Sequence, residues 1–597
     1  MGNSGCHILE VQKSSDKGSG EMLLQSLVDF YHDLEEQGKV LPRGWELINI
    51  SYVLDLDADG NIVAVESVKQ ERTIGKKTIM VPTAMLLPAT VARTSAPRPN
   101  FLWDNSAYIL GFDEMGNSGR AKKAFSACQS WHKEMLSGID SLSAKALSSF
   151  FENWNYEKFR EHPALVPLLD EITFGNITFR VNGSYVVDDP KIRAAWDTSQ
   201  EETANANAVE RTSLATGTQG KIAKLHPQFK GIVGAQPSGA ALVSFNAAST
   251  HSYALNAGMN AQTSEFDTYA YGTALNYLLK DRSHVNRVGE TTILCWAQGG
   301  EAAYQDLFTR LLFQGVEKEP EALLTLLCDL SNGIAVEYDG VELDPKKTFY
   351  VLGLSPNASR LYVRLFHCGS FGEFLGNILT YYQDVEIKGN FSNLLHVWRA
   401  LRETVNPMAK NKNASTNMSA DMLDAVLTGD PYPPALWHQV QDRILIEHDV
   451  TWRKAAITKA YFMRDPHVDV QMKEEVLTVA LNKESKNIPY AMGRLFAVII
   501  SIQDASNPNA VGVIQANNFS SAITTPASTF PFLLEKAYGQ IKRLNDRLAA
   551  SFDRQIMELL DLFDQKFPET LTDQERGAFI LGFYHQMSAK YNKTEKE

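Results

Sequence analysis

The pattern of apolar residues changes near residue 373, and this change divides the chain into a part that mixes strands with helices and a part that is helical. Before this point, short apolar runs such as "TTILCWA" at 291–297 predict buried strands. Amphipathic segments such as "SEFDTYAYGTALNYLLKD" at 264–281 predict helices, but no regular strand–helix–strand repeat connects the two kinds. The pattern therefore predicts an α+β fold and disfavours a doubly wound sheet.

The C-terminal part predicts a helical bundle. One long amphipathic helix is predicted over 532–567, because apolar residues recur there at steps of three and four. These residues are Ala537, Ile541, Leu544, Leu548, Phe552, Ile556, Leu559 and Phe563. "RGAFILGFYHQMSAKY" at 576–591 predicts a final helix. We expect a flexible extension or expression remnant over 1–21, a mixed α/β domain over 22–450 and a helical bundle over 451–597.

A glycine-rich stretch, "GIVGAQPSGAALVSFN" at 231–246, suggests a ligand-binding loop. Gly234 and Gly239 have the spacing of a phosphate-binding P-loop, but two alanines stand where that motif needs lysine and then serine or threonine. A nucleotide site is therefore not predicted. The glycines still allow close approach of the backbone, and Gln236 and Ser238 supply hydrogen-bonding groups. The alternative is a tight loop before a strand over "ALVSF".

Two stretches, 72–103 and 211–264, contain no acidic residue. The chain has 70 acidic residues and a formal net charge of −13. A window as long as the second stretch should therefore contain about six acidic residues. The lysines that we single out in these stretches are Lys76, Lys77, Lys221, Lys224 and Lys230. Because a phosphate backbone repels carboxylates and attracts lysine, the stretches indicate an anionic partner such as DNA. The alternative is that loops rich in small residues lack acids by chance.

The sequence offers little that indicates an enzyme. It contains no H-E-x-x-H or G-x-S-x-G motif, and we expect no cofactor, bound metal or catalytic residue. The alternative is a nucleotide-dependent or metal-dependent nucleic-acid enzyme that uses the glycine loop or His448–Asp449, but no further metal ligands stand out. Residues from Asp55 to Glu66, with Gly60 at the sixth position, have the spacing of a calcium loop. Their strand-like flanks favour a hairpin turn instead.

The cysteines and the hydropathy indicate where the protein works. There are five cysteines, an odd number, and none forms a C-x-x-C pair. This usage is typical of a reducing compartment, so we expect a cytoplasmic protein. No apolar run is long enough to span a membrane.

Several blocks of sequence, in order from Met22 to the C-terminus, carry a family resemblance. They include "MLLQSLVDFYHDL", "PNFLWDNSAYILGFD", "LHPQFKGIVGAQPSGAALVSFNAAS", "VLGLSPNASRLYVRLFHCGSFGEF" and "TTPASTFPFLL". With these blocks the chain resembles the large subunit, of the Cas-eight type, of type I-C CRISPR interference (Cascade) complexes. Only residues 1–21 lie outside the resemblance.

The resemblance implies a non-catalytic role in antiviral defence. Such a subunit joins crRNA-bound subunits of the Cas-five and Cas-seven types and reads a short protospacer-adjacent motif in target double-stranded DNA. It helps to open the duplex, guides the displaced strand of the R-loop and presents the DNA to the Cas-three helicase-nuclease. Guide pairing supplies most of the sequence specificity.

The resemblance also assigns roles in the glycine-rich stretch, by residue type. Gly234 and Gly239 would allow close approach to DNA, and Lys230 would contact a phosphate or a base edge. Gln236 would act as a wedge or reader and Asn246 as a polar reader. Such readout from the minor groove is degenerate, which suits a permissive short motif.

Finally, the resemblance implies that the C-terminal bundle corresponds to the small subunit of related complexes. In this family that subunit arises by internal translation of the large one. Met472 is the preferred internal start and Met463 the second, because "MKEEVLTVALNK" at 472–483 would then form an intact first helix.

Overall fold

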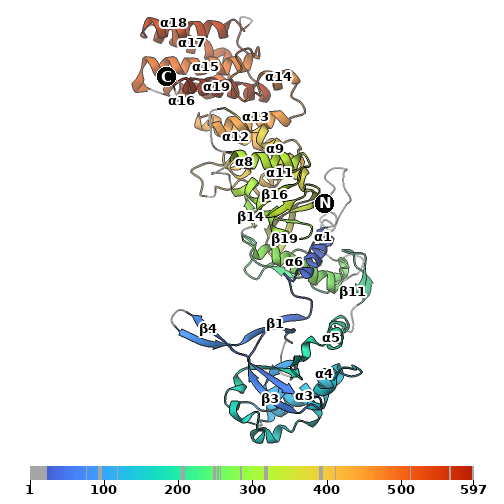
Figure 1. The fold of residues 1–597 in the computed structure, drawn as a ribbon. Coiled ribbons are helices and arrows are strands. Elements are labelled where there is room, and N and C mark those ends of the chain that lie inside the picture. The colour runs from blue at the N-terminus through green and yellow to red at the C-terminus, as the bar shows by residue number, and fades with distance from the viewer. Residues whose placement is uncertain are drawn as a thin grey trace. The chain divides into compact units, whose positions relative to one another are not determined.

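A computed structural model of the chain gives its fold (Figure 1). It describes residues 23–74, 77–91, 97–116, 118–203, 209–245, 251, 255, 257–282, 285–314, 320–388, 394–410, 412–510, 512–563 and 566–594. The chain divides into two compact units, each assembled from separate segments. The larger unit comprises Met1–Asp33, Lys224–Ala261 and Ala270–Glu597, and the smaller unit comprises Leu34–Ala223 and Gln262–Tyr269. The second acid-free stretch is therefore divided between the two units.

The smaller unit contains a five-stranded sheet in the order β3-β2-β8-β7, with β9 paired to β8. Its strands are β2 (Tyr52–Leu56), β3 (Ile62–Ser67), β7 (Trp103–Asn105), β8 (Asn176–Val181) and β9 (Ser184–Tyr185). Strands β2 and β8 run parallel, and the other pairs are antiparallel. The buried rings of Phe150 and Phe151 pack against Phe179 of β8, with centroids 5.6 Å and 5.8 Å away. These aromatic contacts hold helix α4 (Leu142–Asn153) against the sheet.

Further strand pairs and helices complete the smaller unit. The pairs are β1 (Trp45–Ile50) with β6 (Thr83–Pro88), β4 (Gln70–Ile74) with β5 (Lys77–Val81), and β10 (Glu210–Thr212) with β11 (Gln219–Lys221). The helices are α2 (Ser106–Ile109), α3 (Gly119–Met135), α4 (Leu142–Asn153) and α5 (Pro190–Thr203).

The segment with calcium-loop spacing is a hairpin, as its flanks predict. Strands β2 and β3 pair across the turn, and Asp57 accepts hydrogen bonds from the backbone amide and the side-chain amide of Asn61. Asp55 and Glu66 both pair with Arg180 of β8, with 3.1 Å between an Arg180 Nη and Asp55 Oδ2. The two end carboxylates of the supposed calcium loop therefore bind an arginine.

The larger unit contains a six-stranded sheet in the order β12-β13-β19-β18-β15-β14. Its strands are β12 (Gln228–Phe229), β13 (Ala240–Ala241), β14 (Asn286–Val288), β15 (Thr291–Ala297), β18 (Thr348–Asn357) and β19 (Arg360–Ser370). Every residue of β15 is buried, as its apolar run predicts. Strands β13 and β19 are parallel, and the other pairs are antiparallel. A short hairpin of β16 (Val336–Tyr338) and β17 (Val341–Leu343) accompanies this sheet.

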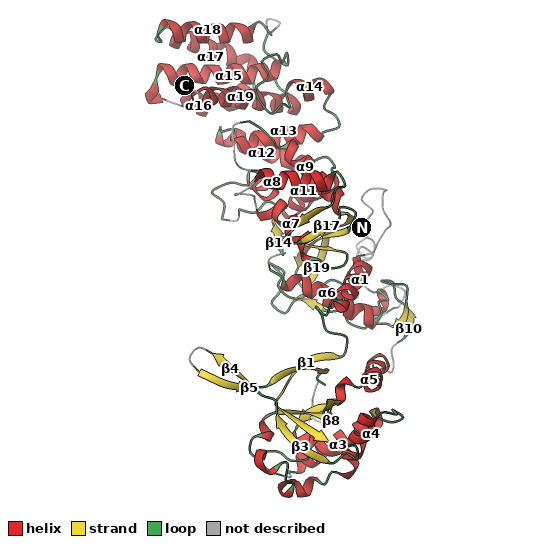
Figure 2. Cartoon of the chain, in the orientation of Figure 1, coloured by secondary structure: helices red, strands yellow, loops and turns green. Residues whose placement is uncertain are grey.

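Every described element that follows β19 is a helix (Figure 2). Besides α2 to α5, the α-helices that precede β19 are α1 (Leu23–Glu36), α6 (Glu265–Lys280), α7 (Ala302–Thr309) and α8 (Pro320–Ser331). The later helices are α9 (Phe371–Asp384), α10 (Val397–Arg402), α11 (Thr416–Thr428), α12 (Pro434–Glu447), α13 (Trp452–Arg464), α14 (Val470–Glu475), α15 (Ile488–Ser506), α16 (Val513–Thr524), α17 (Pro526–Ile541), α18 (Asp546–Leu560) and α19 (Asp573–Thr594). The α+β prediction, with a helical C-terminal part, is confirmed. In the described parts of the chain, no helix has the length and apolar character needed to cross a membrane.

Two glycines allow α15 and α19 to cross closely. A Cβ on Gly493 would lie 1.9 Å from the carbonyl oxygen of Phe579, and a Cβ on Gly582 would lie 2.1 Å from that of Tyr490. Real Cβ atoms do not approach backbone atoms so closely, so any larger residue would separate the helices. The C-terminal helices are therefore packed backbone to backbone at this crossing.

Three local predictions are wrong. The helix predicted over 532–567 is two helices, because the side chain of Asn545 accepts a hydrogen bond from the Leu548 amide and caps the start of α18. The helix predicted over 472–483 ends at Glu475. The strand predicted over "ALVSF" is reduced to Ala240–Ala241.

Candidate nucleic-acid interface

The glycine loop, residues 230–239, connects β12 to β13 at one edge of the six-stranded sheet. Gly231, Gly234 and Gly239 have φ values of +89°, +85° and +105°. Residues with a side chain rarely adopt these values, so the loop path requires glycine at each of the three positions. The predicted glycines therefore shape the loop.

Buried residues hold the base of this loop in place. Phe229 and Ile232 are buried, and the ring of Phe229 lies 6.4 Å from that of Tyr271. The Tyr271 hydroxyl is 2.7 Å from Nδ1 of His226, and burial lowers the pKa of His226 to about 4, so its imidazole is neutral. The loop thus has a fixed base, and its tip is exposed, with Val233 46% accessible.

The structure brings most of the predicted loop residues to the surface. Lys230, Gly234, Gln236 and Ser238 are exposed, whereas Gly239 is buried where the loop enters β13. Lys224 is also exposed and belongs to the same unit. Within the described ranges of the chain, neither Lys224 nor Lys230 forms an ion pair with a carboxylate. Lys230 carries its positive charge within the loop, and Lys224 carries one on the segment that leads into β12.

Of the remaining predicted residues, only Lys221 has a described side chain. Lys76 and Asn246 lie outside the described residues, as does the side chain of Lys77, whose backbone begins β5. Lys221 belongs to the smaller unit, whereas the glycine loop belongs to the larger one.

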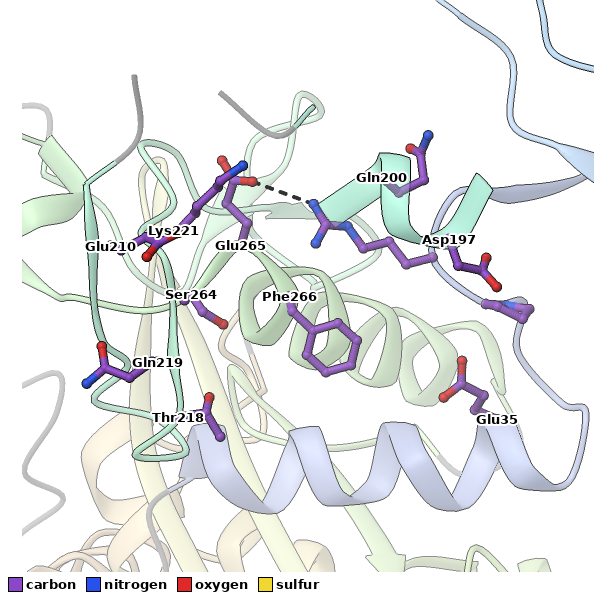
Figure 3. A pocket seen from close by; sticks show the side chains of 13 residues that line it. Glu35, Asp197, Gln200, Glu210, Thr218, Gln219, Lys221, Ser264, Glu265 and Phe266 are labelled. Carbon is purple, nitrogen blue, oxygen red and sulfur yellow. Dashed lines mark ion pairs between the residues drawn. The ribbon is translucent and has the colours of Figure 1, made fainter. Parts of the chain in front are cut away.

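Lys221 lines a pocket of about 570 Å³ in the smaller unit (Figure 3). The carboxylates that line it are Glu35, Asp197, Glu210 and Glu265, and the other cation is Arg43. Arg43 is paired with Glu265 at 3.6 Å, and Glu210 lies opposite Lys221 on the neighbouring strand. Carboxylates outnumber cations here, so the pocket disfavours a phosphate group.

The hairpin of β18 and β19 adds cationic and aromatic side chains that the sequence reasoning missed. It lies beside the glycine loop, because Ala241 pairs with Arg360 and a Cβ on Gly234 would lie 3.1 Å from Pro356. Arg360, Tyr362 and Arg364 alternate along β19. The sequence signal for these side chains was the alternation of Arg, Tyr and Arg with apolar residues in "RLYVR", because residues two apart in a strand share a face.

The turn of the β18–β19 hairpin follows Asn357, the last residue of β18. Pro356 and Asn357 belong to β18, and the turn lies at Ala358 and Ser359, with Ala358 at a φ of +53°. The Asn357 side-chain amide donates a hydrogen bond to the Tyr362 hydroxyl at 2.7 Å. This bond fixes an aromatic ring that is 48% exposed.

Arg364 is held in position from two sides. Its Nε donates to Ser355 Oγ at 2.6 Å, and its Nη1 donates to Asn417 Oδ1 at 3.3 Å. Its guanidinium carbon lies 5.4 Å from the centre of the Tyr362 ring, which is a cation–π distance. An aromatic ring beside a fixed arginine provides a surface on which a base can stack and to which a phosphate can bind.

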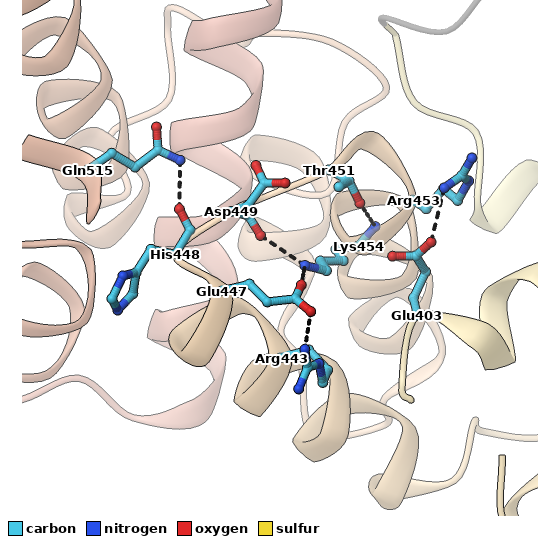
Figure 4. A network of polar contacts seen from close by, with 9 residues as sticks. All are labelled: Glu403, Arg443, Glu447, His448, Asp449, Thr451, Arg453, Lys454 and Gln515. Atoms are coloured by element: carbon cyan, nitrogen blue, oxygen red, sulfur yellow. Dashed lines mark hydrogen bonds and ion pairs between the residues drawn. The ribbon is translucent and has the colours of Figure 1, made fainter. Parts of the chain in front are cut away.

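The His448–Asp449 pair has a structural role (Figure 4). His448 ends α12 in the left-handed conformation, at a φ of +53°, and its carbonyl accepts a hydrogen bond from Gln515 at 2.7 Å. The Asp449 carbonyl accepts a hydrogen bond from the Lys454 ammonium group at 3.2 Å. The imidazole of His448 and the carboxylate of Asp449 point in different directions, so they do not form a shared ligand set. Among the residues with described positions, no cluster of three or more His, Cys, Asp or Glu side chains could hold a metal.

A comparison with protein families covers nearly the whole chain. The family model described as CRISPR-associated protein Csd1 matches residues 27–591. The chain belongs to the Csd1 family. This family comprises the large subunit of type I-C complexes, so the resemblance seen in the sequence is confirmed. A comparison with curated proteins found no match.

The Csd1 match includes both parts of the candidate interface. The glycine loop and the β18–β19 hairpin lie within residues 27–591. Family membership places the chain among CRISPR-associated proteins.

Proposed function

We propose that this Csd1 chain is the non-catalytic DNA-recognition subunit of a crRNA-guided type I-C Cascade complex. In this proposal the glycine loop reads the protospacer-adjacent motif in duplex DNA. The observation that carries the proposal is the loop itself: an anchored base, an exposed tip and three glycines, within a stretch of 54 residues (211–264) that has no acidic side chain. Within this stretch a duplex backbone meets no carboxylate.

Each loop residue has a role that follows from its chemistry. The exposed Gly234 leaves room for close approach, and Gly239 sets the path by which the loop returns to the sheet. Lys230 contacts a phosphate or a base edge, while Gln236 and Ser238 offer hydrogen bonds to the minor groove. Arg360 and Arg364 of the adjacent hairpin extend the cationic surface.

The wider role follows from the type I-C family. The chain assembles with crRNA-bound subunits of the Cas-five and Cas-seven types, aids duplex opening and guides the displaced strand. It presents the DNA to the Cas-three helicase-nuclease. The guide RNA supplies sequence specificity by base pairing, so a permissive motif reader is sufficient. A small subunit made by internal translation completes the assembly.

Photo-crosslinking from the loop tip tests this function. A photoreactive p-benzoylphenylalanine at position 236 of the assembled complex should crosslink to target duplex beside the adjacent motif. The control places the same residue at Val470, which is 70% exposed on α14, and should give no such crosslink. A complex that binds its target but gives no crosslink from position 236, or gives an equal one from position 470, contradicts the proposal.

A further inference from the structure

A second cationic surface lies at the other edge of the six-stranded sheet. A pocket of about 420 Å³, here called the Trp398 pocket, is formed by β14 and its turn, by α10 and by the segment before α11. Its polar lining consists of Asn286, Arg287, Arg402, Lys412 and Asn413, and its aromatic lining consists of Trp398 and Phe313. The sheet order places β14 and β12 at opposite edges, so this pocket is separate from the glycine loop.

The Trp398 pocket has three cations and no carboxylate in its lining. Arg287, Arg402 and Lys412 are exposed, and no ion pair involves them among the residues that the structure describes. The acids nearest to them in the sequence are engaged elsewhere. Glu290 accepts a hydrogen bond from Thr416 Oγ1 at 3.0 Å, and Glu403 pairs with Arg453 at 3.2 Å.

This charge arrangement favours an anionic ligand. Three like charges around one pocket repel one another, and a bound anion relieves that repulsion. The Arg287 Nε donates to the Gly289 carbonyl at 2.7 Å, which fixes one of the three side chains at the pocket edge.

The indole of Trp398 gives the same pocket an aromatic surface. The guanidinium carbons of Arg399 and Arg402 lie 5.1 Å and 5.9 Å from the centre of its ring, so both arginines are within cation–π distance of the indole. Phe313 and Leu401 add an apolar wall. Bases stack on both indole rings and guanidinium planes, whereas an inorganic anion would use neither the ring nor the wall.

We propose that the Trp398 pocket binds a single-stranded polynucleotide. One unpaired base stacks on Trp398 and its arginine neighbours, and the flanking phosphates contact Arg287, Arg402 and Lys412. The volume is in the range of small-ligand sites, and the exposed cations suit a chain that passes across the surface. The displaced DNA strand and the guide RNA share this chemistry, so either can supply the ligand. The inference rests on the proposed function only in that it places the chain in a complex that contains nucleic acid.

The test measures binding of fluorescein-labelled 15-mers of dT and rU to the full-length chain by anisotropy at several salt concentrations. Arg402→Gln with Lys412→Gln should weaken binding and lower the slope of log affinity against log salt by about 1.4, since each lost contact with a single strand contributes about 0.7. Trp398→Leu should weaken binding about tenfold and leave the slope unchanged, because a stacked base contributes without charge.

The control is Lys346→Gln with Lys410→Gln, which removes two exposed charges of the larger unit outside the pocket lining. It should leave the affinity and the slope close to those of the unmodified chain. Tighter binding of dT would identify the displaced DNA strand as the ligand of the Trp398 pocket, and tighter binding of rU would identify the guide RNA.

If the pocket variants bind both oligomers like the control, the inference is wrong. Crosslinking from position 236 to duplex DNA is independent of that result, so a failed pocket and a failed motif reader can be told apart. Melting curves that match the unmodified chain establish that Trp398→Leu is folded.

Discussion

At the scale of single residues, His132 shows how packing fixes a protonation state. Its ring is fully buried in the smaller unit and lies 4.4 Å from the ring of Phe151. Nε2 accepts a hydrogen bond from the Leu102 amide at 3.0 Å, so Nδ1 carries the proton and donates to the Cys128 carbonyl at 2.9 Å. Burial lowers the pKa of His132 to about 4. The folded chain therefore requires the neutral imidazole.

This requirement predicts a loss of stability in acid. The pKa of His132 falls from about 6.5 unfolded to about 4 folded, so the unfolded chain binds the extra proton. Neutral His132 therefore contributes fully to the free energy of unfolding above pH 6.5. This contribution is lost as the pH falls toward 4, by at most about 1.4 kcal/mol for each pH unit. The substitution His132→Phe removes this pH-dependent contribution and leaves the Leu102 amide unpaired. The unpaired amide lowers the free energy of unfolding by about 1–3 kcal/mol at pH 7.5.

Thermal unfolding of both chains, followed by tryptophan fluorescence from pH 7.5 to 4.5, checks this prediction. The gap between the midpoints of the unmodified chain and His132→Phe should narrow as the pH falls. Parallel pH profiles would show that His132 is not held neutral.

At the scale of elements, the glycine loop depends on two glycines in different ways. A Cβ on Gly239 would lie 3.1 Å from the Phe229 carbonyl oxygen, whereas a Cβ on Gly231 would meet no atom within 4 Å. Both residues have positive φ, so alanine at either position costs about 1–2 kcal/mol in backbone strain. Only Gly239→Ala adds a contact with the strand that anchors the loop.

Hydrogen–deuterium exchange of the two variants separates these effects. Gly239→Ala should raise amide exchange in peptides that cover 228–242 more than Gly231→Ala does, because the pairing of β12 with β13 is disturbed. Equal exchange in the two variants would mean that the close approach at Gly239 is not needed for the pairing.

An element could be predicted from the sequence where the pattern of apolar residues within that element determines whether it forms a helix or a strand. The continuous apolar run of β15 and the strand-like runs of the 52–67 hairpin belong to this group. The break between α17 and α18 does not, because the apolar spacing continues through Asn545 and only its side-chain cap interrupts the helix. The loop residues could be named from glycine spacing and missing acids. The residues of β19 beside the loop have their own signal in "RLYVR". Their closeness to the loop could not be predicted, because a parallel pair of strands brings the two segments together.

At the scale of the whole molecule, one apolar core extends through the larger unit. Its members run from Val288 of β14 to Tyr584 of α19, so it includes residues on both sides of position 450. The boundary predicted there falls between α12 and α13 and stays a prediction. A product that starts at Met472 would begin inside α14 and keep α15 to α19, including the close crossing of α15 and α19.

We therefore expect a second, shorter product that begins at Met472, or alternatively at Met463, to copurify with the complex. The apolar contacts between α15 and α19 would give it a core of its own. Intact-mass spectrometry of a complex made from the native coding sequence checks this. A functional complex that contains only the full-length chain would contradict internal translation.

The salt dependence of duplex binding by the assembled complex tests the central claim, that the glycine loop contacts target DNA. Lys224→Ala with Lys230→Ala should weaken binding and lower the slope of log affinity against log salt by about two, since each lost phosphate contact contributes about one. Gln236→Ala should keep the slope and reduce discrimination between motifs. The control, Lys346→Ala with Lys410→Ala, should change neither quantity. An affinity and a slope that stay unchanged in the Lys224 and Lys230 variant would contradict the account.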